Sequence, residues 1–183
     1  ASLDLDELAS TKTMWNIGPI TQAFTAVAVM QLKEAGKLNL SDPISRHVPG
    51  LPAAWQRITI LQLMQHSSGI ADYRVHLDDA KQYRPTELLD LVRAEPLRFK
   101  SGTQVALSAT DAALLALAIE HAGGMPYREF VRRHQIDPMH LDSTMFADEF
   151  AAKAKIDRPA SHPGDNQHSR FKAEEPFINP VEP

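Results

Sequence analysis

Residues 17–40 read IGPITQAFTAVAVMQLKEAGKLNL, and this stretch predicts a long helix near the start of the chain. Pro19 suits the first helical position, because the backbone N–H that proline lacks would be unpaired there. Gly36 is the residue expected to stop the helix. Between them, apolar side chains recur at helical spacing at Ile20, Phe24, Val27, Ala28 and Leu32.

Further helices are expected along the chain, so the predicted fold class is mainly α. Capping and stop signals place a helix from Thr59 through Gln65, one capped by Thr86 over Glu87–Arg93, a long one from Thr110 to Gly123-Gly124, and one over Pro126–Arg133 with Tyr127, Phe130 and Val131 inward. Alternating patterns typical of strands are scarce.

Short motifs follow one another over roughly residues 13–146. They are Ile17-Gly18-Pro19-Ile20-Thr21-Gln22, Ser41-Asp42-Pro43-Ile44, His66-Ser67-Ser68-Gly69-Ile70-Ala71-Asp72-Tyr73, Lys100-Ser101-Gly102-Thr103, Gly124-Met125-Pro126-Tyr127 and Asp137-Pro138-Met139-His140. In this order they resemble the serine β-lactamase and penicillin-binding-protein superfamily. The resemblance implies the helical core of an α/β fold, most of whose sheet strands this chain lacks, and a location outside the cytoplasm.

The first catalytic motif of that family is Ser-x-x-Lys, in which nucleophile and amine lie one helical turn apart. Its positions here are Pro19 and Gln22. Proline supplies neither a nucleophile nor the N–H that the family uses to stabilise an oxyanion, a loss that by itself costs about 10²–10³ in rate. Glutamine can hydrogen-bond but cannot titrate. Both catalytic roles are therefore vacant.

The second motif, Tyr-x-Asn, falls by register on Leu107, Ser108 and Ala109, so phenol and carboxamide are both replaced and an apolar pair is expected to line that wall. The third motif, Lys-Thr-Gly, does not follow; its nearest echo is Lys12-Thr13, before the first helix. We therefore predict no catalytic residue, and a remnant pocket at positions 19, 22 and 107–109.

Other hydroxyl groups are weak substitutes for the missing serine. Thr21 is turned about 200° from the face of Pro19 on a helix. Ser67 and Ser68 are best explained as a helix-ending turn closed by Gly69. Ser108 is nearest the pocket, but no base is placed beside it by sequence.

Composition indicates a soluble globular protein. The chain has 183 residues, 43% apolar and 23% charged, with a net charge of −4 and no basic cluster that would favour nucleic acid. No apolar run is long enough to span a membrane. Cysteine is absent, and the eight histidines show no ligand spacing, so neither a metal nor another cofactor is expected.

Residues 1–157 are interpreted as a partial β-lactamase-like helical domain and residues 158–183 as a Pro-rich extended or mobile tail. Helices without their sheet would expose an apolar face, so we expect a second copy or a protein partner to cover it. Two functions compete: a non-catalytic binding or assembly module, and a serine hydrolase of the β-lactamase, esterase or carboxypeptidase type, or a fragment of one.

Overall fold

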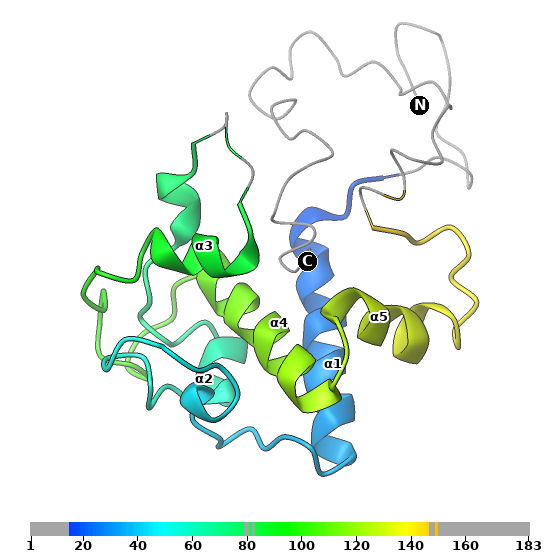
Figure 1. Cartoon of the computed structure of the whole chain (residues 1–183), viewed down its shortest axis with the longest axis horizontal. Coiled ribbons are helices and arrows are strands. Elements are labelled where there is room, and N and C mark those ends of the chain that lie inside the picture. The colour runs from blue at the N-terminus through cyan, green and yellow to red at the C-terminus, as the bar shows by residue number, and fades with distance from the viewer. Residues whose placement is uncertain (1–14, 79–80, 82, 147–148, 150–183) are drawn as a thin grey trace, which may run out of the picture.

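The computed structural model describes residues 15–78, 81, 83–146 and 149, and within them the fold is helical (Figure 1). Its elements are η1 (Gly18–Ile20), α1 (Thr21–Glu34), η2 (Ile44–Arg46), α2 (Ile60–Met64), η3 (Tyr73–His76), α3 (Pro85–Asp90), α4 (Ala109–Gly123), α5 (Tyr127–Val131) and η4 (Arg132–Ile136). The described residues hold no strand, and their extended pairing is one antiparallel bridge between Pro43 and Thr59. The expected mainly α class is thereby confirmed.

Helix α4 is the centre of the described fold. It packs against α1, α2, α3 and α5, and in Figure 1 it crosses the middle of the molecule beside α1. Ala113, Ala116 and Ala118 are fully buried on it, and such short side chains let neighbouring helices approach closely. Leu114 and Ile119, also fully buried, fill the remaining space. The helix runs from Ala109, one residue before the predicted start.

The helix predicted within residues 17–40 forms as α1, but two of the residues predicted for its buried apolar face are exposed. Ile20 is 64% exposed and Val27 is 47% exposed, whereas the buried positions of α1 are Thr25, Ala28, Val29 and Leu32. Apolar residues occur on every side of this helix, so their spacing does not decide which face meets α4.

Gly36 ends α1 as predicted. Its φ is +68°, a left-handed conformation that suits glycine. Its N–H donates to the Lys33 carbonyl and the Lys37 N–H donates to the Leu32 carbonyl, which together make a Schellman motif.

Thr59 begins α2 with the expected cap, whereas the predicted start of α3 was wrong. The Thr59 hydroxyl accepts from the Gln62 N–H, and the Gln62 side chain accepts from the Thr59 N–H. In α3, by contrast, Pro85 takes the first helical position and Arg84 is the capping residue, so Thr86 lies inside the helix. A proline at that position fixes the helical φ and needs no N–H partner.

Among the described residues, no helix has the length and apolar character required to cross a bilayer. The boundary expected at residues 157–158, the tail beyond it and the Lys12-Thr13 pair all lie outside the described residues.

Candidate functional site

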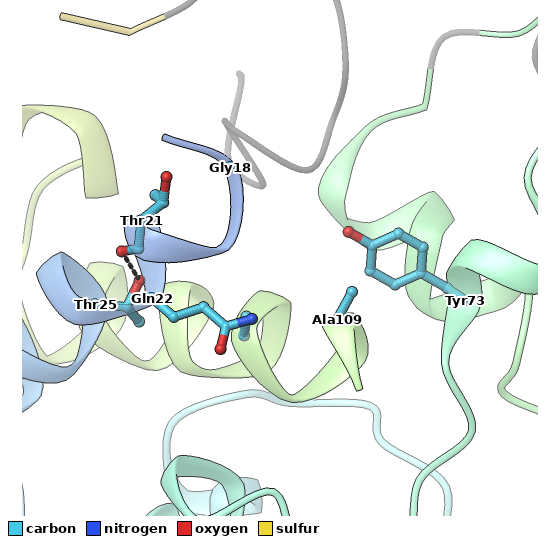
Figure 2. Close-up of a pocket in the computed structure, with 7 residues that line it drawn as sticks. Gly18, Thr21, Gln22, Thr25, Tyr73 and Ala109 are labelled. Carbon is cyan, nitrogen blue, oxygen red and sulfur yellow. Dashed lines mark hydrogen bonds between the residues drawn. The ribbon is translucent and has the colours of Figure 1, made fainter. Parts of the chain in front are cut away.

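A cavity lies where the first turns of α1 and α4 meet (Figure 2). Its lining residues are Gly18, Thr21, Gln22, Thr25, Tyr73, Ala109 and Ala112, and it holds about 300 Å³ of space, open solvent included. Gln22 and Ala109, two of the five positions predicted for a remnant pocket, therefore share one cavity. Tyr73 adds a phenol, which Figure 2 shows across the opening from Gln22.

The other three predicted pocket positions do not line this cavity. Pro19 lies in the short turn η1 and is exposed. Leu107 is 70% exposed, so the expected apolar pair with Ala109 is not formed. Ser108 is buried and its hydroxyl donates to the Ala71 carbonyl at 3.4 Å. Ser108 is the extended residue directly before α4, so Leu107 precedes the helix and is exposed to solvent, whereas Ala109 begins the helix and is buried.

Gln22 is held by a hydrogen-bonded chain that joins three segments. Its Oε1 lies 3.0 Å from Nε2 of His66, and Nδ1 of His66 lies 3.2 Å from Oδ2 of Asp111. The Ser68 hydroxyl donates to the other carboxylate oxygen of Asp111 at 2.5 Å. Gln22 in the cavity wall is therefore bonded to His66, which contacts Asp111, and these two residues lie behind the wall and do not line the cavity.

Sequence reasoning missed the roles of His66 and Asp111. His66 was noted as part of a motif but given no function, and Asp111 was not singled out. A usable signal exists for Asp111, because it is an acidic residue near the start of an otherwise apolar helix. It lies in the first turn of α4 and is 0% exposed, where the helix dipole favours negative charge.

The Asp111 carboxyl is in an unusual electrostatic environment. Burial raises its pKa, and the hydrogen bonds from His66 and Ser68 oppose that rise, while the negative charge of Asp72 adds to it. Asp72 differs: burial pushes its pKa upward, but the Arg74 side chain and N–H bind the carboxylate and the net pKa is lowered. Asp111 is thus the carboxyl of this region that most readily takes up a proton.

The turn at residues 66–69 fixes His66 beside Gln22. His66 has a φ of +52°, and its carbonyl accepts from the Ala106 N–H. Gly69 has a φ of +81°, and a Cβ there would lie 2.3 Å from the Phe99 carbonyl oxygen, so glycine is required. The predicted helix-ending turn is present, but His66 closes it and not Gly69: the His66 N–H donates to the Leu63 carbonyl and the Ser67 N–H donates to the Gln62 carbonyl.

Of the hydroxyl side chains considered as substitute nucleophiles, Ser67 and Ser68 are hydrogen-bonded within the protein, whereas that of Thr21 is not. Ser67 donates to the Gln62 carbonyl, and Ser68, besides its bond to Asp111, accepts from the Ile70 N–H. Both belong to the turn. Thr21, which the helical geometry was expected to direct away, instead lines the cavity, and its buried Oγ1 has no hydrogen-bond partner.

In the part of the chain that the structure describes, no group of three or more His, Asp or Glu side chains is arranged to hold a metal ion. A second cavity of about 380 Å³, open solvent included, is lined mainly by Ile17, Phe24, Tyr127, Val131, Ile136 and Phe146 and is largely apolar.

Comparison with known proteins gives a consistent set of relatives. A family model described as Beta-lactamase matches residues 2–177. Protein flp of Staphylococcus aureus strain N315 is 32% identical over 145 residues, which are 75% of this chain and 29% of the relative. The chain therefore spans less than a third of that relative's length.

Two solved structures have the same fold over the region they share. The penicillin binding protein from Bacillus halodurans is 30% identical with a TM-score of 0.61, covering 68% of this chain and 39% of that one. The octameric penicillin-binding protein homologue from Pyrococcus abyssi is 28% identical with a TM-score of 0.68, covering 83% and 36%.

Proposed function

The chain belongs to the beta-lactamase family, and on that premise we propose that it is a non-catalytic member whose cavity binds a ligand without reacting with it. The observation that carries the proposal is the state of Gln22. A neutral amide stands where the family motif has a titratable amine, and it lies against His66 instead of beside a nucleophile. Acyl transfer needs an activated hydroxyl next to a base.

The hydroxyl groups near the cavity support this proposal. Ser68 and Ser108 are buried and their protons are donated to Asp111 and to the Ala71 carbonyl. Thr21 has no hydrogen-bond partner for Oγ1, so no base activates it. The alternative, a serine hydrolase or part of one, would require a different hydroxyl to be both exposed and paired with a base.

Covalent labelling separates the two functions. The chain is incubated with a fluorophosphonate and, separately, with a penicillin, and its intact mass is measured. We expect no added mass, while an active serine hydrolase treated in parallel is labelled. An adduct on this chain that disappears when one serine is changed to alanine would establish the hydrolase alternative.

Binding is tested on the same cavity. Because Gln22 and Ala109 offer an amide and an apolar surface but no fixed positive charge, we expect penicillin to bind more weakly than micromolar in calorimetry. Small neutral fragments with hydrogen-bonding groups should shift the NMR signals of Gln22 and Ala109. Sub-micromolar penicillin binding, or a fragment set that leaves both signals unmoved, would contradict the proposed binding function.

Association between copies accompanies this proposal. Ile20 at the end of η1 and Val27 and Met30 on α1 are exposed apolar residues, and the Pyrococcus abyssi homologue is described as octameric. We expect multi-angle light scattering to find an oligomer at micromolar concentration and Val27→Glu to dissociate it. Lys33→Glu, at an exposed position of the same helix, is the matched control. A wild-type monomer that binds no apolar dye would contradict the association.

A further inference from the structure

The side-chain amide of Gln22 lines the cavity, and a hydrogen bond to His66 fixes its orientation. Oε1 of Gln22 faces Nε2 of His66 at 3.0 Å. Figure 2 shows Nε2 of Gln22 on the opposite side, directed toward Ala109 and the cavity. The amide therefore presents its N–H donors to any molecule that enters, and the partner that holds it in this orientation is His66.

The orientation of Gln22 determines how many protons the His66–Asp111 pair holds. The Gln22 oxygen can only accept, so Nε2 of His66 must carry a proton. Nδ1 faces the Asp111 carboxyl at 3.2 Å, and this contact also needs a proton, either on Nδ1 or on Asp111. In both arrangements the pair holds two protons between the imidazole and the carboxyl.

When the His66–Asp111 pair loses one proton, Gln22 must donate a hydrogen bond to His66 instead of accepting one. The remaining proton belongs on Nδ1, because a bare Nδ1 would face a carboxylate oxygen with two lone pairs in contact. Nε2 of His66 is then an acceptor and needs a donor. If the Gln22 amide rotates by half a turn, its own Nε2 donates a hydrogen bond to Nε2 of His66, and its Oε1 faces the cavity.

We propose that the His66–Asp111 pair acts as a protonation switch that sets whether Gln22 offers the cavity a hydrogen-bond donor or an acceptor. The doubly protonated pair selects ligands with an accepting oxygen, such as a carbonyl or sulfoxide. The singly protonated pair selects ligands with an N–H or O–H donor. The ligand class rests on the proposed binding function, whereas the switch itself does not.

The other groups around the pair do not replace either member. Ser68 donates to Asp111 from the turn after α2, and Asp72 acts on Asp111 only through its charge, which Arg74 offsets. Gln22 on α1 is the remaining side chain bonded to His66. Burial raises the pKa of Asp111, which favours the doubly protonated state of the pair at low pH.

NMR on the full chain without any ligand tests the switch. Ring ¹⁵N shifts of His66 report which nitrogens are protonated, and NOEs from the Gln22 amide protons report where they point. Over a pH series in which the ring shifts show that the pair loses one proton, we expect NOEs to the Ala109 methyl group to give way to NOEs to the His66 ring. Unchanged Gln22 NOEs while the pair loses its proton would overturn the proposal.

Asp111→Asn provides a locked variant. The asparagine amide donates permanently to Nδ1 of His66, so Nε2 keeps its proton and Gln22 should stay in the donor orientation over the whole range. Asp42→Asn is the matched control, because Asp42 also contacts a histidine, at 3.1 Å, but that histidine is His47 and not His66. It should leave the Gln22 rotation as in the wild type. Rotation that persists in Asp111→Asn would overturn the switch.

Dimethyl sulfoxide is the probe for selectivity, since it accepts hydrogen bonds, donates none and does not titrate in this range. Its affinity for the wild type should fall about threefold to tenfold as the pair deprotonates, the effect of one hydrogen bond, and should stay constant in Asp111→Asn. Equal affinity across the range despite amide rotation would overturn the selectivity. No binding at any pH with rotation intact would contradict the proposed function while supporting the switch.

Discussion

The buried contact between Tyr127 and Thr25 allows a quantitative test of how α5 is attached to α1. The Tyr127 hydroxyl lies 2.7 Å from Oγ1 of Thr25, and the two residues are 0% and 4% exposed. Thr25 otherwise reaches only the Thr21 carbonyl at 3.5 Å, the limit of a hydrogen bond. Tyr127→Phe therefore strands a buried hydroxyl and should lower the free energy of unfolding by about 1–3 kcal/mol.

A double-mutant cycle isolates the pair. Thr25→Val should cost a similar amount, and the Thr25→Val/Tyr127→Phe double variant should lose about 1 kcal/mol less than the sum of the single losses, because both polar groups are gone. Urea unfolding followed by circular dichroism measures all four proteins. Tyr83→Phe, which removes a more exposed hydroxyl, is the control and should change stability by less than about 0.5 kcal/mol. Additive single effects would refute the argument.

The same tyrosine predicts a loss of stability at alkaline pH. Burial raises the pKa of the Tyr127 phenol from its usual 10.0 to about 12, partly opposed by the Thr25 hydrogen bond. The folded protein thus keeps the phenol proton that the unfolded chain releases, so this stabilisation is complete below about pH 10 and about 3 kcal/mol is lost as the pH rises to about 12. Tyr127→Phe should lack this component, and an identical alkaline profile in both proteins would contradict it.

Three further substitutions test the packing and the turns that position the cavity. Gly69→Ala places a Cβ against the Phe99 carbonyl at a positive φ, and we expect a loss of more than about 2 kcal/mol in thermal or urea unfolding; wild-type stability would contradict the required glycine. Leu114→Ala at the centre of α4 should cost about 2–5 kcal/mol, while Leu107→Ala on the surface should cost less than about 0.5, and similar costs would contradict the assigned burial. Thr59→Ala removes the α2 cap and should cost about 1 kcal/mol; no loss in urea unfolding would argue against the capping box.

Much of the fold follows from local signals in the sequence. The cap at Thr59, the stop at Gly36 and the long apolar run of α4 act within a few residues, so they can be recognised without knowing the tertiary structure. The buried face of α1 could not be predicted in the same way. Ile20 and Val27 satisfy a helical spacing as well as Thr25 does, and only contacts with α4 and α5 decide between them.

The candidate site was predictable only in part. Gln22 and Ala109 were found through the family motifs, because those motifs occupy fixed positions at the ends of helices. The partners of Gln22 were not, since His66 is 44 residues from Gln22 and 45 from Asp111. Spacing rules within one helix or turn carry no information over such separations. Thr21 was misplaced for a different reason, because its direction was judged from Pro19, which lies in η1 and does not line the cavity.

The length of those separations has a practical consequence for finding a ligand. Gln22, His66 and Asp111 meet only when three remote parts of the chain are assembled, so the cavity does not exist in the denatured chain. A molecule that occupies it would bind the native state alone and raise the melting temperature in proportion to the logarithm of its concentration. Thermal-shift screening across pH is therefore a direct route from this architecture to the identity of the bound compound.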